Sequence, residues 1–277
     1  MSAEMSAAKP ARTIALIHGL FLNHQSWDPW VERYKQRGFD VRPLAWPGLE
    51  GSVEELRNDP TPLTKLSVKS VLDNLSAQVS KLKSPIIMGH SFGGLFAQLL
   101  AYHGFGSAVV GIDPTAPAGV LELPFSTLRA AAPVLANPLN VDKATMLTPE
   151  QFHYAFTNTV STEKSRELYE RYAIPCANRV LFEGAFENFA VHSPARVDVK
   201  ADRAPILIIA GGQDHLVPFS YSKANFELIS KSPGVTALKV FGERPHFTGG
   251  VDGWEEVADF AIDWALDPSA TTPVPVA

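Results

Sequence analysis

A serine enclosed by glycines interrupts an apolar part of the chain and could act as a nucleophile. In PIIMGHSFGGLFAQLLA, residues 85–101, Ser91 lies among Gly89, Gly93 and Gly94 where a buried strand is expected to meet a helix. Two interpretations are open at this point. The stretch is either a tight packing corner with an idle serine, or a G-x-S-x-G turn that raises the serine hydroxyl above a sheet for acyl transfer.

Side chains that could activate this serine follow later strand-like segments. A serine hydroxyl is a weak nucleophile, so it needs a base and an acid that orients the base. His246 lies in VFGERPHFTGG and Asp214 lies in IIAGGQDHLVP, each just past an expected strand. The order serine, aspartate, histidine favours the catalytic interpretation. Asp113 in GIDPTAP is the rival for the acid, and the proline after it predicts an extended backbone there.

Acyl transfer also requires N–H donors for the negative charge that develops on the substrate oxygen. The backbone N–H of Leu20, in LIHGLFLNHQSW, and that of Phe92, directly after the serine, are the predicted donors. We expect His18 to brace the first of these loops. We expect His90 to point into the packed core, His215 to lie on the surface, and Cys176 to have a structural role.

Alternating strands and helices would have to position these residues. Short apolar runs, many of them β-branched, predict six strands. They span residues 13–18, 39–45, 85–90, 108–113, 205–211 and 236–242. Amphipathic segments predict helices over 27–37, 64–82, 92–103, 219–231 and 252–266. Near-continuous apolar strands that alternate with helices indicate an α/β fold with a parallel sheet covered on both faces.

One interval breaks this alternation and predicts a helical insertion. Residues 118–200 contain no strong strand, but TPEQFHYAFTNT and STEKSRELYERYA predict helices that start at Thr or Ser caps. We expect this insertion to cover the ends of the strands as a cap. The predicted organisation is a disordered tail at 1–11, a core at 12–117 and 201–267, the cap at 118–200, and a disordered tail at 268–277.

Composition narrows the class of protein and its partners. The 277 residues carry 24 Lys and Arg against 29 Asp and Glu, a net charge of −5 without a basic stripe, so no nucleic-acid partner is expected. The sequence contains neither an apolar run of the ~18 to 20 residues that span a membrane nor a secretory signal pattern. A single cysteine is consistent with a cytoplasmic protein. The histidines show no metal-binding spacing, and neither a metal nor another cofactor is predicted.

The quoted motifs together resemble those of the α/β-hydrolase superfamily, in particular its capped esterase-like members. HGLFLNHQSW, GHSFGG, GGQDHLVP and PHFTGG carry the resemblance, which covers roughly residues 12 to 266. It implies that Ser91 is the nucleophile, His246 the general base and then acid, and Asp214 the orienting acid. It further implies that Leu20 and Phe92 supply the oxyanion amides. The two leading strands of many relatives are expected to be missing, which leaves six parallel strands.

The predicted function is that of a serine hydrolase that cleaves a carboxylic ester, lactone or thioester of a small to medium-sized apolar substrate through an acyl-enzyme intermediate. Four aromatic residues are predicted to bind the substrate: Phe21, Phe156, Phe186 and Phe189. Two alternatives remain: cleavage of C–C bonds or hydroxynitriles with the same three residues, or ligand binding with little turnover. The protein is expected to be a monomer or a homodimer without a membrane association.

Overall fold

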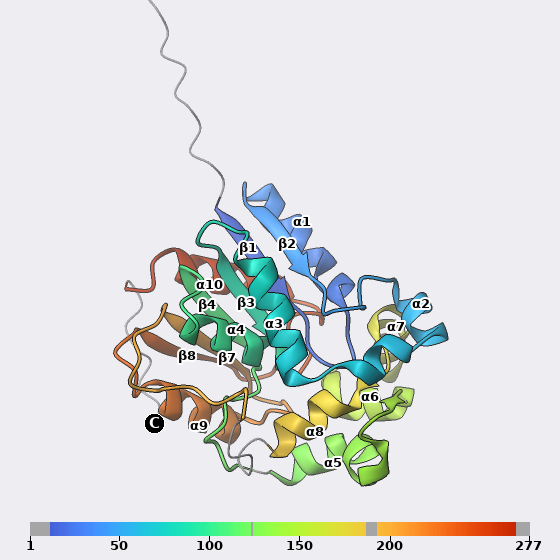
Figure 1. Ribbon diagram of the computed structural model, residues 1–277. Coiled ribbons are helices and arrows are strands. Elements are labelled where there is room, and N and C mark those ends of the chain that lie inside the picture. Colours follow the sequence, from blue (N-terminus) through green and yellow to red (C-terminus); the bar gives the residue numbers. More distant parts are fainter. Residues whose placement is uncertain (1–11, 123, 187–192, 270–277) are drawn as a thin grey trace, which may run out of the picture.

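The computed structural model describes residues 12–122, 124–186 and 193–269. Six parallel strands form the central sheet in the order β2-β1-β3-β4-β7-β8 (Figure 1). Their bounds are β1 Thr13–Ile17, β2 Asp40–Leu44, β3 Ile86–His90, β4 Ala108–Ile112, β7 Ile206–Gly211 and β8 Thr236–Phe241. The predicted six-stranded parallel sheet is confirmed.

The sheet is buried on both faces because successive side chains of each strand enter two separate cores. On one face, strand residues such as Leu16, Met88 and Val110 pack with helices α1 (Asp28–Gln36) and α10 (Trp254–Leu266). On the other face, alternate strand residues such as Ile17, Ile87 and Val109 pack with three helices. These are α3 Val68–Val79, α4 Phe92–Tyr102 and α9 Phe219–Ile229. This double burial explains why the strands are almost continuously apolar.

The order of the strands determines where a site can form. After β1 the chain adds β2 on one side of that strand. It then adds β3, β4, β7 and β8 in turn on the other side. The direction therefore reverses between β1 and β3. Ligands of open α/β sheets bind outside the carboxyl ends of the strands at such a reversal. Loops that start at His18 and at Ser91 meet there.

The described residues between β4 and β7 form four α-helices, which Figure 1 shows together at one end of the sheet. They are α5 Phe125–Leu135, α6 Pro149–Phe156, α7 Thr162–Tyr172 and α8 Asn178–Phe186. The side chains of Thr148 and Ser161 accept hydrogen bonds from Gln151 N and Lys164 N, as their predicted capping roles require. Two two-residue strands, β5 (Ala144–Thr145) and β6 (Cys176–Ala177), also pair here in antiparallel fashion.

Several short elements were not predicted from the sequence. Helix α2 (Val53–Asn58) begins with a capping box in which Ser52 and Glu55 bond each other's backbone N–H groups. Three short 3-10 helices complete the described elements: η1 His24–Trp27, η2 Thr61–Lys65 and η3 Pro138–Asn140. The tails predicted to be disordered lie outside the described residues, apart from 268 and 269.

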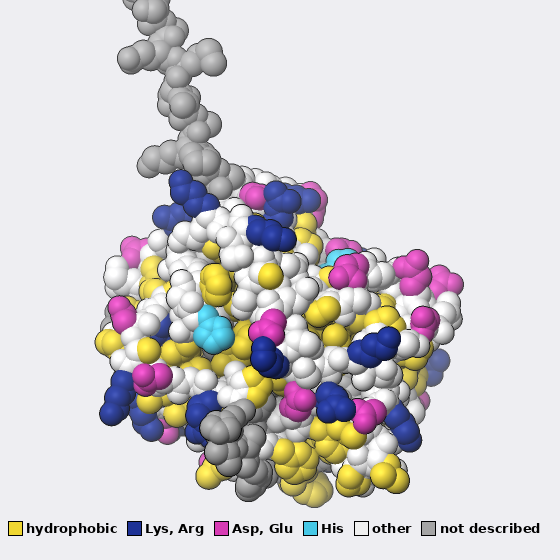
Figure 2. Space-filling view, viewed as in Figure 1, with side chains coloured by type: hydrophobic (Ala, Val, Ile, Leu, Met, Phe, Trp, Pro, Cys, Tyr) yellow, Lys and Arg dark blue, Asp and Glu magenta, His cyan; other side chains and the backbone are white. Residues whose placement is uncertain are grey.

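The surface of the cap is partly apolar. Figure 2 shows hydrophobic side chains gathered at the edge where α5 and α8 lie, and the exposed large ones from these elements include Phe125, Leu128 and Phe186. Within the described ranges, no helix is both long and apolar enough to cross a membrane.

Candidate active site

Ser91 lies in a strained turn that only glycine neighbours permit. Its backbone angles are φ 55° and ψ −122°, a region that residues with a side chain rarely occupy. A Cβ atom on Gly89 would lie 2.1 Å from the Gly93 carbonyl oxygen, and one on Gly93 would lie 2.2 Å from the Ile17 carbonyl oxygen. These two glycines therefore allow β3, α4 and β1 to meet closely around the serine. This geometry is that of a strained turn rather than a relaxed packing corner.

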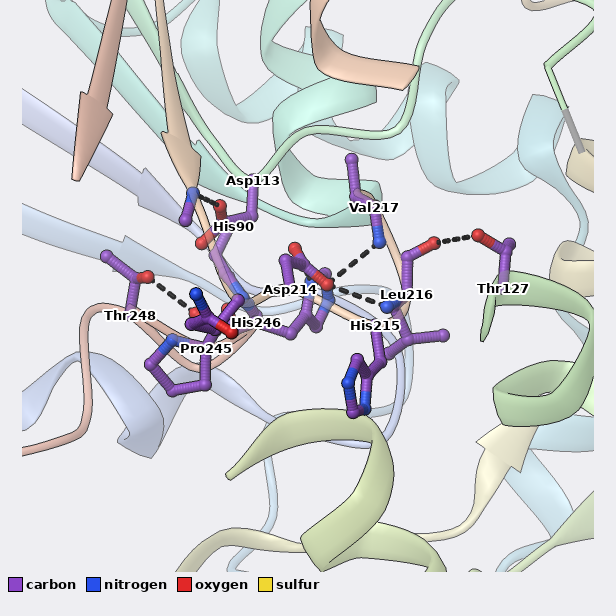
Figure 3. Close-up of polar contacts among 12 residues, drawn as sticks. His90, Asp113, Thr127, Asp214, His215, Leu216, Val217, Pro245, His246 and Thr248 are labelled. Carbon is purple, nitrogen blue, oxygen red and sulfur yellow. Dashed lines mark hydrogen bonds and ion pairs between the residues drawn. The ribbon is translucent and has the colours of Figure 1, made fainter. Parts of the chain in front are cut away.

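A buried hydrogen bond joins Asp214 and His246 where β7 and β8 end. The Asp214 Oδ2 atom lies 2.7 Å from His246 Nδ1, and both side chains are fully buried. The other carboxylate oxygen, Oδ1, accepts hydrogen bonds from the backbone N–H groups of Leu216 and Val217 at 2.7 and 2.8 Å (Figure 3). These two bonds fix the carboxylate in place, so its second oxygen faces the imidazole.

The hydrogen bond to Asp214 leaves one imidazole nitrogen of His246 without a partner among the described residues. A carboxylate only accepts hydrogen bonds, so Nδ1 must carry the proton and Nε2 of the neutral ring carries a lone pair. His246 Nε2 is buried and has no hydrogen-bond partner among the described residues. A nitrogen in this state can take a proton from a nearby hydroxyl.

His90 connects the serine turn to the histidine loop. Its Nε2–H donates to the His246 carbonyl oxygen at 2.8 Å, and the two imidazole rings are 4.8 Å apart. Burial and the neighbouring His246 lower the pKa of His90 to about 3, so this ring is neutral at physiological pH. Ser91 follows directly in the chain, and the structure contains no hydrogen bond between its hydroxyl and His246 Nε2. The three predicted catalytic residues thus lie at one edge of the sheet, but no hydrogen bond joins the histidine to the serine.

The predicted oxyanion donors lie on either side of the serine turn. Phe92 is the first residue of α4, so its N–H has no partner within the helix and lies at the positive end of the helix dipole. The loop of Leu20 adjoins the turn, since a Cβ on Gly19 would lie 2.8 Å from the Ser91 Cβ. Neither N–H takes part in a hydrogen bond of the described residues.

His18 supports the loop of Leu20 through two hydrogen bonds and a ring contact. Its Nδ1–H donates to the Gly19 carbonyl oxygen at 2.9 Å, while Nε2 accepts from the Trp46 N–H at 3.4 Å. Its ring also stacks on the Trp46 ring at 4.9 Å. Burial lowers the pKa of His18 to about 4, so the ring is a neutral support at neutral pH.

Of the four predicted substrate-binding aromatics, Phe156 lies beside His246 and Phe21 lies beside Phe156. The Phe156 ring is 5.1 Å from the His246 ring, and the Phe21 ring is 5.8 Å from the Phe156 ring. Phe186 is 54% exposed and packs against Phe182, so the structure does not bring it to His246. Phe189 lies outside the described residues.

The backbone of Asp113 has a different conformation from the one that its sequence context predicted. Its φ is 46°, so the expectation of an extended backbone was wrong. Its N–H donates to the Ile209 carbonyl oxygen at 2.8 Å, and its Oδ1 accepts from the Gly211 N–H at 2.6 Å. These two long-range bonds to β7 hold the residue in the left-handed region, which aspartate tolerates better than most residues. Asp113 forms no hydrogen bond to His246 in the structure.

The cap contacts the loop that carries Asp214. Thr127 Oγ1 on α5 donates to the Leu216 carbonyl oxygen at 2.8 Å. Asn158 donates to the Gln213 carbonyl oxygen at 3.0 Å. His215, which was expected on the surface, is half-buried and its Nδ1–H donates to the Tyr154 carbonyl oxygen at 2.8 Å. No sequence motif indicated these contacts, because they depend on how the cap folds over the core.

The site is covered in this structure. Ser91 is 7% exposed, and His246 is wholly enclosed. A cavity of about 520 Å³ lies elsewhere, between α2 and the end of α7, and it is lined by residues such as Arg57 and Tyr172. None of Ser91, Asp214 and His246 lines that cavity.

Comparison with known proteins identifies the family of this chain. Residues 14–268 match the sequence model described as the alpha/beta hydrolase family. The chain belongs to the α/β-hydrolase family. No curated protein sequence matches it.

Among solved structures, this α/β hydrolase is similar to polyneuridine aldehyde esterase, with a TM-score of 0.66, 17% identity, and coverage of 91% of this chain and 98% of that one. A pyrethroid hydrolase from Sphingobium faniae JZ-2 matches with a TM-score of 0.66, 16% identity, and coverage of 94% and 100%. A monoacylglycerol lipase from Paleococcus ferrophilus matches with a TM-score of 0.64, 19% identity, and coverage of 93% and 95%. At these identities the matches show a common fold.

Proposed function

We propose that the protein is a serine hydrolase that cleaves a carboxylic ester of a small or medium-sized apolar substrate. The observation that carries this proposal is the buried Asp214–His246 pair, at 2.7 Å, whose free Nε2 lies at the same sheet edge as the strained Ser91 turn. A structural ion pair would not require a glycine-enclosed serine beside it. Together the three residues provide a nucleophile, a base and the group that orients the base.

The proposed reaction has two halves. In the first, Ser91 Oγ attacks the ester carbonyl carbon while His246 Nε2 accepts the hydroxyl proton. His246 returns this proton to the leaving alkoxide as the C–O bond breaks, which leaves the acyl group on Ser91. In the second half, His246 takes a proton from water, the resulting hydroxide equivalent attacks the acyl carbon, and Ser91 recovers its proton as the acid departs. Asp214 stabilises the imidazolium that forms in both halves.

The backbone would stabilise the tetrahedral intermediates. The N–H groups of Leu20 and Phe92 are free of other hydrogen bonds among the described residues and border the serine turn. The positive end of the α4 dipole adds to their effect on a developing oxyanion. Removal of one such donor in hydrolases typically costs about 10²- to 10³-fold in kcat.

The aromatic surroundings favour an apolar substrate. Phe156 and Phe21 form an edge-to-face series of rings that ends at His246. Two of the structural relatives are named as a pyrethroid hydrolase and a monoacylglycerol lipase. Since the catalytic side chains are covered, the cap must move for a substrate to enter, and we propose that residues 118–200 act as this lid.

A substrate panel with the wild type and Ser91→Ala tests the proposal. We expect turnover of chromogenic short-chain esters by the wild type and a loss on the order of 10³-fold or more in kcat for Ser91→Ala. Cleavage of diketones in place of esters would point to C–C hydrolysis. Tight ligand binding without turnover of any panel member would point to a receptor-like protein. Either result would overturn the proposed ester hydrolysis.

A further inference from the structure

Asp113 is a buried carboxyl group that the proposed reaction does not use. Its side chain is inaccessible to solvent at the carboxyl end of β4. Oδ1 accepts one hydrogen bond, from the Gly211 N–H at 2.6 Å (Figure 3), and Oδ2 has no hydrogen-bond partner among the described residues. An ionised carboxylate in this position would leave most of its lone pairs unsatisfied, at a high cost in free energy.

The two neighbouring aspartates differ in the number of donors that face them. Asp214 accepts hydrogen bonds from two backbone N–H groups and from the His246 Nδ1–H, which together stabilise a negative charge. Asp113 accepts a bond from the Gly211 N–H alone, apart from its contact with Thr248. The negative charge of Asp214 also acts on Asp113, and two neighbouring carboxyl groups do not both ionise readily.

The side chain of Thr248 is a second polar neighbour of the Asp113 carboxyl. Thr248 interacts with the Asp113 carboxyl. Its hydroxyl donates to the Pro245 carbonyl oxygen at 2.6 Å, so the Thr248 oxygen can only accept from Asp113. Pro245 and Thr248 flank His246, and Gly211 starts the turn that leads to Asp214. A protonated Asp113 would therefore accept a hydrogen bond from Gly211, which precedes the Asp214 loop, and donate one to Thr248 in the His246 loop.

We infer that Asp113 is held as a neutral carboxylic acid that positions the Asp214 loop and the His246 loop relative to each other. The effect of Asp113 on catalysis rests on the proposed function. Its protonation state does not depend on that function. Burial raises the pKa of Asp113 well above its ordinary value, and the Asp214 carboxylate raises it further, against the smaller lowering effects of the Gly211 and Thr248 interactions. Among the described residues, Asp214 is the charged group that acts on Asp113, while His90 ends the neighbouring strand β3 and His246 follows β8.

Asparagine tests this inference because it imitates the neutral acid. In Asp113→Asn, the amide oxygen can accept from Gly211 and the NH₂ group can donate to Thr248, but the side chain cannot ionise. We expect kcat within about threefold of the wild type near neutral pH. Asp113→Leu removes both bonds, and we expect a loss of about tenfold or more in kcat with a smaller change in KM. Asp73→Asn, on the exposed face of α3, is the matched control.

A measurement without turnover separates this inference from the proposed function. Infrared difference spectra of wild type against Asp113→Asn should contain the carbonyl band of a protonated carboxylic acid near neutral pH, and the Asp73→Asn difference should lack it. Absence of that band, or a kcat loss in Asp113→Asn as large as in Asp214→Asn, would overturn the inference. If the wild type hydrolyses no ester but the band is present, only the proposed function fails.

Discussion

Asp214 and His246 are 32 residues apart in the chain, yet their side chains meet at 2.7 Å in a site closed to solvent. The contact follows from the topology, because β7 and β8 are parallel neighbours and each ends directly before one of the two loops. Backbone bonds to the carboxylate fix its orientation, and the carboxylate in turn fixes the tautomer of the imidazole.

Replacing the carboxylate should reverse that tautomer. In Asp214→Asn the amide can donate to Nδ1, which would move the imidazole proton to Nε2 and remove the base. We expect a fold unchanged by circular dichroism and a loss on the order of 10² to 10⁴ in kcat for a chromogenic ester. Asp113→Asn is the comparison. A larger loss in Asp113→Asn than in Asp214→Asn, with both variants folded, would reassign the acid to Asp113.

The serine turn should not tolerate a side chain at Gly93. A Cβ there would lie 2.2 Å from the Ile17 backbone oxygen and 2.5 Å from that of His18, so β1 or α4 must shift. We expect Gly93→Ala to lower the free energy of unfolding by about 2 kcal/mol or more in urea denaturation. Gly242→Ala, which has no atom within 4 Å of the added Cβ, is the control. Equal stability of the two variants would show that the turn is not strained as described.

Phe156 should contribute to both stability and substrate choice. It is 1% exposed, stacks on Phe152 at 4.9 Å and faces His246. We expect Phe156→Ala to lose about 3 to 5 kcal/mol of unfolding free energy and to shift the preferred acyl chain of an ester series. Phe186→Ala, at an exposed position of the same cap, should change stability by less than about 0.5 kcal/mol. An unchanged order of substrates in Phe156→Ala would place the acyl pocket elsewhere.

The raised pKa of Asp113 predicts how stability depends on pH. Between its ordinary pKa and its raised pKa, the folded state binds more protons than the unfolded state, so this group's stabilising effect is complete at low pH and declines as pH rises. Asp113→Asn lacks that decline. We expect its unfolding free energy, relative to the wild type, to increase from pH 4 upward by at most about 1.4 kcal/mol per pH unit. A difference that is constant between pH 4 and pH 8 would contradict the raised pKa.

Much of the fold follows from local sequence patterns, and less of the site does. Continuous apolar strands and the G-x-S-x-G turn predict the parallel sheet and the place of Ser91, because burial on both faces and backbone crowding leave few other solutions. The rotation of a helix in the cap is a tertiary property, so no local signal showed that Phe156 faces inward and Phe186 outward. The left-handed backbone of Asp113 depends on bonds to Ile209 and Gly211, nearly a hundred residues away.

Covalent labelling with an organophosphonate ester is the most direct measurement of the proposed chemistry. The probe requires a serine activated by a base and an oxyanion site, and it needs no knowledge of the natural substrate. We expect intact-mass analysis to show one adduct per chain, and peptide mapping to place it on Ser91. Ser91→Ala should remain unlabelled, and Asp214→Asn should react more slowly. A stoichiometric adduct on another residue, or no adduct on the folded wild type, would contradict the assignment of Ser91 as the nucleophile.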